Sequence, residues 1–185
     1  MLETEYKEII EETTYRKIEN AYNWDWTAEQ TNSYYFSKLP ELAKSKTMVR
    51  IREKDGIFKI QVKKHHPSKK SLHISEETEF DIDSAVPVID AETAKKITGI
   101  DSGELHKYGS LTTLRHSLMW NDTTEICLDK STYLDRTDYE IEVEYTGEMP
   151  EKLKEELNGL GISFKKFTPG KFSRFTQRLN ELKSK

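Results

Sequence analysis

Several features that common protein classes depend on are scarce or missing in this sequence. Cys127 is the one cysteine among 185 residues, which excludes an intrachain disulfide framework and favours a reducing compartment. No apolar run approaches the roughly 20 residues that a membrane helix needs. The first residues, Met1-Leu2-Glu3, carry neither the basic nor the apolar stretch of a signal peptide. The sequence therefore predicts a cytoplasmic protein with no membrane partner.

Apolar residues are also scarce, and positive charge does not dominate. Hydrophobic residues make up 35% of the chain and charged residues 34%, against a usual charged quarter. Disorder does not follow, because the apolar residues recur at strand and helix spacings and include nineteen Phe, Trp and Tyr residues. A net charge of −4 argues against a general nucleic-acid binder, whose domain is normally basic.

The pattern of the chain predicts one α+β domain over residues 1–185, dominated by antiparallel strands. Strands are expected at 3–7, 31–36, 48–52, 58–63, 77–83, 111–120, 124–130, 139–145 and 162–167. Helices are expected at 12–22, at 90–97 and from Pro150 to a stop at Gly161. Residues 40–46 and 65–70 are expected to be loops, 102–109 is either helix or loop, and the chain ends in a basic tail.

One pattern recurs on these strands: apolar side chains occupy one face and charged side chains occupy the other. Successive side chains point to opposite faces, so Glu3, Glu5 and Lys7 share a face. The strands at 77–83 and 139–145 carry acids on their polar face. The hairpin predicted around Asp55-Gly56 carries bases there, namely Arg50, Arg52, Lys59 and Lys63.

This sorting of charge by sign allows two architectures. One is an open antiparallel sheet with its polar face in water. That sheet gains little from sorting, since exposed ion pairs contribute only about 0–1 kcal/mol each. The other is a closed barrel of about eight strands with the charged faces inward and helices packed outside. Enclosed charges cost several kcal/mol unless they are partnered, so such a barrel needs a charged ligand, water or counter-charges.

A ligand that combines many negative charges with attached metal ions complements both the acidic and the basic strand faces. Carboxylates suit Mg²⁺ or Mn²⁺, which prefer hard oxygen donors. Arginine presents a planar fork to phosphate oxygens and lysine a point charge. A triphosphate carries about four negative charges. A site of this kind performs phosphoryl transfer mainly by positioning and charge neutralisation.

The stretch Glu3-Thr4-Glu5-Tyr6-Lys7 resembles the ExExK motif of the CYTH superfamily, also called triphosphate tunnel metalloenzymes. The resemblance spans nearly the whole chain and is most similar to the bacterial YjbK-type branch. It continues in order through Arg50-Ile51-Arg52, Lys63, Arg115, Asp129, Glu140-Ile141-Glu142 and Lys171. It implies an eight-stranded antiparallel tunnel that binds a triphosphate and a divalent metal.

Carried over by position, the resemblance assigns a role to each charged residue. The metal side would be Glu3, Glu5, Glu140 and Glu142. The phosphate side would be Lys7, Arg50, Arg52, Lys63, Arg115 and Lys171, with Lys59 and Arg174 matched less securely. Glu5, Lys7 and Glu142 would carry the catalysis. Ser37 stands where an Asp often follows the Tyr-Tyr-Phe strand, so that position is left out of the site, while Glu144 simply continues the acidic face.

The activity that the resemblance implies is hydrolysis of a small triphosphate, whether inorganic, thiamine or nucleoside triphosphate. A fold does not fix a reaction, so two alternatives stay open. One is a class IV-like adenylyl cyclase, and the other is a non-catalytic polyphosphate or nucleotide-binding protein. The number of metals and the oligomeric state, a homodimer included, also stay open. His65-His66 is expected in a solvated loop, and Cys127, Trp24 and Trp26 are expected to have structural roles.

Overall fold

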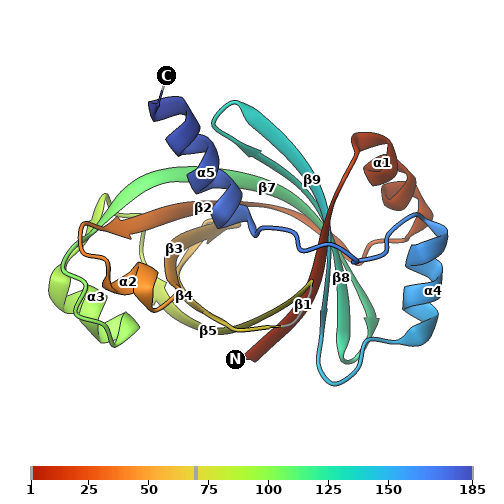
Figure 1. Ribbon diagram of the computed structural model, residues 1–185, viewed down its shortest axis with the longest axis horizontal. Helices are drawn as coiled ribbons and strands as arrows, with labels where there is room; N and C mark the ends of the chain where they lie inside the picture. The colour runs from red at the N-terminus through yellow and green to blue at the C-terminus, as the bar shows by residue number, and fades with distance from the viewer. Residues whose placement is uncertain (1, 69–70, 185) are drawn as a thin grey trace.

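Eight antiparallel strands close into a barrel in this protein, whose computed structural model describes residues 2–68 and 71–184 (Figure 1). Around the barrel the order is β2-β3-β4-β5-β1-β9-β8-β7, and β7 pairs back to β2 along its length. The short β6 pairs with Leu105 and His106, the first two residues of β7. The predicted closed barrel is confirmed, and the open sheet is wrong.

The strands are longer than the sequence pattern indicated, because pairing extends beyond the alternating residues. Their bounds are β1 (Leu2–Ile10), β2 (Trp26–Ser37), β3 (Thr47–Lys54), β4 (Ile57–His66), β5 (Leu72–Ile82), β6 (Val88–Ile89), β7 (Leu105–Asn121), β8 (Thr124–Tyr133) and β9 (Arg136–Tyr145). The β3–β4 hairpin turns at Asp55 and Gly56, whose φ angles of 53° and 75° are those of a tight turn of the I′ type. Of the loop predicted at 65–70, His65 and His66 belong to β4, and Lys69 and Lys70 lie outside the described residues.

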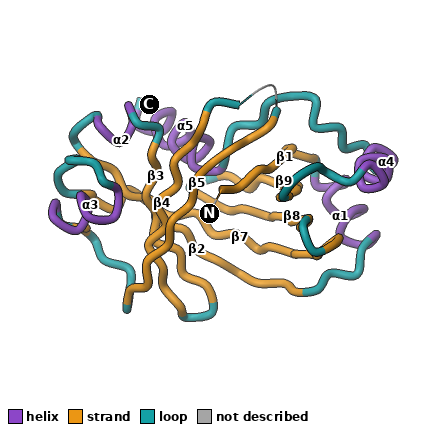
Figure 2. Tube along the Cα trace, turned by 90° about the horizontal axis from the view of Figure 1, so that it is seen from below, coloured by secondary structure: helices purple, strands orange, loops and turns teal. Residues whose placement is uncertain are grey.

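Four of the five helices in the described residues cover the outside of the barrel, at opposite ends of the molecule (Figure 2). They are α1 (Glu12–Ala21), α2 (Glu41–Lys44), α3 (Ala91–Thr98) and α4 (Glu151–Gly159). α1 and α4 bury Tyr15, Ile18 and Leu153 against outward side chains of β8 and β9. α2 and α3 pack on the apolar face of the β3–β4 hairpin. No helix in the described part of the chain has both the length and the apolar character needed to cross a membrane.

The fifth helix, α5 (Lys171–Lys183), lies against the barrel beside β2 and β7, where the sequence predicted only a basic tail (Figure 1). Phe175 is fully buried there and packs with Tyr34, Leu111 and Tyr133. Gly109 makes room for it, because an added Cβ would lie 2.5 Å from the Phe175 ring. This packing places the first residue of the helix, Lys171, inside the barrel.

Three further expectations need correction. Residues 41–44, within the loop predicted at 40–46, form the short helix α2. Residues 105–109, part of the stretch predicted as helix or loop, form the start of β7. The strand expected at 162–167 does not form. Its alternation is real, since Ile162 and Phe164 are buried against α4 and β1, but the backbone N–H groups of Ser163 and Phe164 donate to the Glu8 carboxylate instead of to a neighbouring strand. The positive φ of Phe164, 50°, also interrupts an extended backbone.

Candidate functional site

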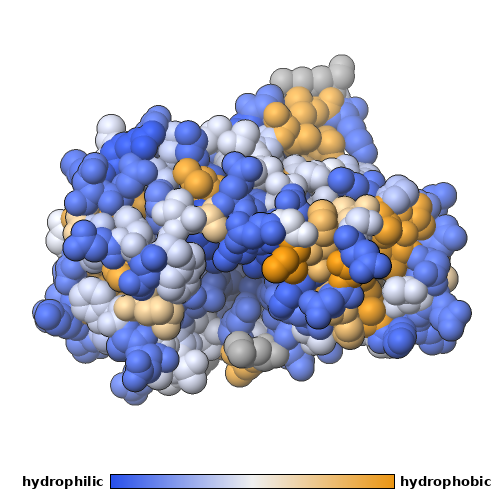
Figure 3. Space-filling view, turned by 180° about the vertical axis from the view of Figure 1, so that it is seen from behind, coloured by the Kyte–Doolittle hydropathy of each residue, from blue (hydrophilic) through white to orange (hydrophobic). Residues whose placement is uncertain are grey.

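The charged faces of the strands enclose a cavity of about 650 Å³ inside the barrel. That volume is in the range of small-molecule sites, although the walls here are unusually polar. All of the sequence-predicted site residues except Lys59, Glu140 and Arg174 line it, which brings together Glu3, Glu5, Lys7, Arg50, Arg52, Lys63, Arg115, Glu142 and Lys171. The outer surface shows separate apolar patches in a mainly hydrophilic face (Figure 3).

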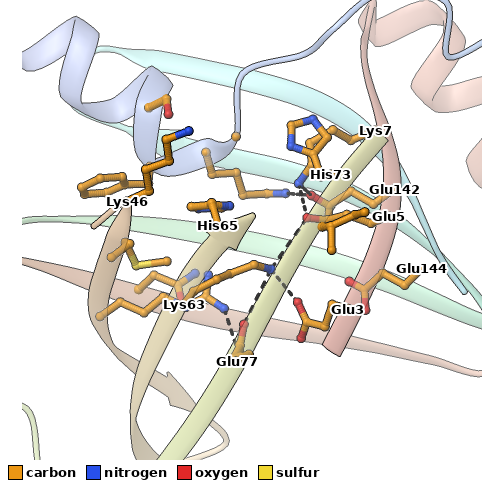
Figure 4. Close-up of a pocket in the computed structure, with 18 of the residues that line it drawn as sticks. Glu3, Glu5, Lys7, Lys46, Lys63, His65, His73, Glu77, Glu142 and Glu144 are labelled. Atoms are coloured by element: carbon orange, nitrogen blue, oxygen red, sulfur yellow. Dashed lines mark hydrogen bonds and ion pairs between the residues drawn. The ribbon is translucent and has the colours of Figure 1, made fainter. Parts of the chain in front are cut away.

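Carboxylates from β1 and β9 form one wall of the cavity (Figure 4). Strand pairing sets Glu5 opposite Glu144 and Lys7 opposite Glu142, so that the acids of the two strands converge. Carboxylate oxygens of Glu5, Glu142 and Glu144 all lie within 4.8 Å of one another. Three hard oxygen donors at this spacing fit Mg²⁺ or Mn²⁺.

The three carboxyl groups differ in proton affinity. Burial favours the neutral form of Glu5, but Lys7 and Lys63 outweigh it and lower its pKa to about 2. Burial also favours the neutral form of Glu142. The positive charges of Lys171, Lys7 and Arg115 outweigh this effect and hold the pKa of Glu142 well below the usual range. Burial, together with the neighbouring Glu5 and Glu142, raises the pKa of Glu144 to about 7, although Arg115 opposes the shift. Glu144 is therefore the carboxyl group that carries a proton most readily.

This shift predicts a pH-dependent gain in stability for Glu144→Gln in metal-free buffer. The folded-state pKa of Glu144 exceeds its ordinary value of 4.5, so its ionisation lowers the free energy of unfolding as the pH rises toward 7 and above. Glutamine cannot ionise. We expect the variant's gain in unfolding free energy to be about 1–2 kcal/mol larger at pH 8 than at pH 5, which allows for the 32% of the side chain that is exposed. Urea denaturation at both pH values measures it, and an equal gain at both would contradict the prediction.

A second group of acids, made of Asp129, Glu140 and Glu142, already contains its own cations. The Nζ atom of Lys171 lies 2.8 Å from Asp129 and 2.8 Å from Glu142, and it also contacts Glu140. Arg174 Nη1 lies 3.1 Å from Glu140. Glu140 is fully buried behind these cations and does not line the cavity. Its role as a metal ligand stays a prediction, and Glu144 occupies the place beside Glu5 and Glu142.

Arginine and lysine side chains from β3, β4 and β7 form the facing wall. Lys63 Nζ lies 2.6 Å from Glu3 on β1 and 3.6 Å from Glu77 on β5, so it contacts carboxylates of two strands (Figure 4). Arg115 makes a bidentate pair with Asp129, with N–O distances of 2.8 and 2.7 Å, and also contacts Glu142. Most of these cations thus have a carboxylate partner within the protein.

Arg52 is the exception. Its Nε donates to the side-chain oxygen of Asn32 at 3.0 Å, and no carboxylate in the described residues lies within 4 Å of its guanidinium. Burial, with the positive charges of Arg50 and Arg115 nearby, lowers the pKa of Arg52. The partly buried guanidinium of Arg52, whose pKa nearby Glu77 partly restores, can accept an anion as a closer charge partner.

Lys59 lies apart from the cavity. Its Nζ pairs with Glu79 at 2.8 Å, and both side chains are about 40% exposed. Its predicted part in substrate binding stays a prediction. Ser37, which the sequence left out of the site, donates to the carbonyl oxygen of Ser102 and does not line the cavity either.

Several lining residues were not predicted from the sequence, and they fall into two kinds. Some, such as Asn32 and Tyr34, share a face on β2 and could have been found by alternation. Others come from strand ends and loops, where alternation gives no signal; they include Lys46, His65, His73 and Phe167. His65 was expected in solvent but lines the cavity, and burial next to Lys63 lowers its pKa to about 4.

Comparison with known proteins adds a family match. The family model described as the CYTH domain matches residues 1–179. No curated protein is a significant match. Among solved structures, a candidate adenylate cyclase from Bacillus halodurans is 26% identical with a TM-score of 0.71, and the match covers 92% of this chain and 95% of that one.

Two more distant structures share the fold. A Hippeastrum protein, described as a candidate adenylyl cyclase with a dominant triphosphatase activity, is 23% identical with a TM-score of 0.75 and matches over 95% of both chains. The Mimivirus capping enzyme triphosphatase is 14% identical with a TM-score of 0.53, over 86% of this chain and 87% of that one. At these identities the likeness shows the fold alone.

Proposed function

Because this chain belongs to the CYTH domain family, we propose that it is a divalent-metal-dependent hydrolase of a small triphosphate bound inside the barrel. The observation that carries the proposal is Arg52, a half-buried cation with no carboxylate within 4 Å among the described residues, in a cavity whose opposite wall is a carboxylate cluster. Such a cavity suits an anion that arrives with a cation. A bare anion would meet the acids, and a bare metal would meet the bases.

The basic side chains that line the cavity bind and orient the phosphates in this proposal. They are Lys7, Arg50, Arg52, Lys63, Arg115 and Lys171. Lys7 stays an ammonium group there, because Glu142 and Glu5 raise its pKa against the effect of burial. These side chains stabilise the charge that moves onto the leaving oxygen when water attacks the terminal phosphorus and the bridging P–O bond breaks.

The donor chemistry of Glu5, Glu142 and Glu144, with Glu3 beside them, fits a hard divalent cation. When bound, such an ion neutralises phosphate charge and activates water. Lys7 pairs with both Glu5 and Glu142, at 2.9 and 3.1 Å. Binding of metal and phosphate together would let each charged side chain exchange an internal partner for a ligand, so that neither wall is left unpaired.

A substrate panel tests the proposal. We expect the protein with Mg²⁺ or Mn²⁺ to release phosphate from inorganic triphosphate, thiamine triphosphate or ATP, with a chelator as the control. Cyclic AMP and pyrophosphate from ATP would instead indicate the adenylyl cyclase. Tight triphosphate binding without turnover under either metal would indicate the non-catalytic binder. The YjbK-type branch, the cytoplasmic location and a homodimer stay predictions beside it.

A further inference from the structure

The arginines that line the cavity are held by two kinds of partner. Arg115 is held by a carboxylate, because its Nε and Nη2 atoms donate to Asp129 at 2.8 and 2.7 Å. Arg50 and Arg52 are each held at Nε by the oxygen of a neutral amide. A carboxylate orients a guanidinium and balances its charge, whereas an amide oxygen orients it and leaves the charge available to a ligand.

Asn32 on β2 supplies the amide that holds Arg52. The two residues lie directly opposite each other in the β2–β3 pairing, and Asn32 Oδ1 accepts a hydrogen bond from Arg52 Nε at 3.0 Å. Asn32 is 1% exposed and lines the cavity, so this bond is shielded from bulk water. The guanidinium makes no other hydrogen bond within the described residues. Its Nη1 and Nη2 donors are therefore available to an anion.

Gln61 on β4 holds Arg50 in the same way. The two residues are opposite each other in the β3–β4 pairing, and Gln61 Oε1 accepts from Arg50 Nε at 2.6 Å. Gln61 is also 1% exposed, and its Nε2 atom donates to Glu79, which fixes the orientation of the amide. Glu77 lies 3.6 Å from Arg50 Nη2, a distance longer than a hydrogen bond. The arrangement is thus repeated for both arginines that β3 presents to the cavity.

We propose that Asn32 and Gln61 are positioning residues of the phosphate site, each orienting its arginine toward the cavity without neutralising the arginine's charge. This inference rests on the proposed function, because the ligand of the two arginines is the triphosphate. An apolar residue in place of either amide would leave a buried Nε–H without an acceptor and free the long side chain to move. A carboxylate would keep the hydrogen bond but would take up the charge that an anion needs.

A double-mutant cycle tests whether Asn32 acts through Arg52. We expect Asn32→Leu to weaken binding of a non-hydrolysable imido analogue of inorganic triphosphate about tenfold, because Arg52 must be ordered again when the ligand binds. Calorimetric titration in the presence of Mg²⁺ measures it. In an Arg52→Met background the same substitution should change binding less than about twofold, since no guanidinium is left to orient. An equal loss in both backgrounds would overturn the proposal.

Asn32→Asp is a second variant, which decides the question if Asn32→Leu does not fold. It keeps the shape and the hydrogen bond, so the midpoint of urea denaturation should not fall, while binding of the same analogue should weaken by more than about tenfold. Gln30→Glu is the matched control. Gln30 lies two residues away on the same face of β2, lines the cavity and is 5% exposed, so the control adds the same charge at a similar depth. The control should lose less affinity, and equal losses would overturn the proposal by reducing the effect to repulsion of the anion.

The positioning role and the hydrolase fail in different ways. If the wild type binds the analogue but releases no phosphate from inorganic triphosphate, the hydrolase is refuted, and a loss in Asn32→Leu that depends on Arg52 still sustains the positioning role. If the wild type releases phosphate and both Asn32 variants bind the analogue as the wild type does, the positioning role is refuted and the hydrolase stands. No binding of the analogue by the wild type would refute both.

Discussion

Glu5→Gln should lower metal-dependent phosphate release on the order of 100-fold, the scale seen when an enzyme loses a metal contact or a key electrostatic group. The amide keeps the shape of the side chain and removes the charge that a divalent cation needs. The free energy of unfolding should change only modestly, because Lys7 keeps Glu142 as a partner at 3.1 Å. Phosphate release at several Mg²⁺ concentrations measures it, and excess metal should restore part of the activity.

Glu76→Gln is the matched control for this experiment. Glu76 lies on β5, next to β1, but its side chain is exposed and does not line the cavity. The control should retain wild-type activity and metal dependence. Full activity in a folded Glu5→Gln variant would show that Glu5 is not a metal ligand. It would also contradict the proposal that the carboxylates of β1 and β9 form the metal site.

The sequence predicted most of the barrel because a closed sheet with a charged interior imposes a simple rule on every strand. Alternation within the segments around Glu5, Arg52 and Glu142 was enough to assign inward and outward faces. The same rule predicted the charged site, since residues on inward faces must meet inside the closed barrel. It also indicated that bases dominate the β3–β4 hairpin while acids dominate β5 and β9.

The rest depended on interactions that no local pattern encodes. Ile162 and Phe164 alternate like a strand, yet the Glu8 side chain takes the N–H groups that pairing would have used. Phe167 follows in the same irregular segment, so its place in the cavity lining had no signal in the sequence. Whether Glu140 or Glu144 joins the metal side was equally hidden, because it depends on where α5 places Lys171.

Arg52→Met should separate binding from stability, since the two readouts are expected to move in opposite directions. Methionine removes the half-buried charge and keeps similar length. The free energy of unfolding should therefore rise by about 1 kcal/mol, after the lost hydrogen bond to Asn32 offsets part of the relief from burying a cation. Binding of inorganic triphosphate should weaken on the order of 100-fold, because the anion loses a charge partner that lines the cavity.

Lys59→Met is the control that decides what Arg52→Met means. Lys59 lies across from Arg52 in the β3–β4 hairpin, but its exposed ammonium pairs with Glu79 outside the cavity. Losing that pair should change the unfolding free energy by less than about 1 kcal/mol and leave binding nearly unchanged. Calorimetric titration with inorganic triphosphate and urea denaturation give both quantities. If Arg52→Met were destabilised and still bound triphosphate as the wild type does, Arg52 would be a structural cation and the proposed anion receptor would lie elsewhere in the barrel.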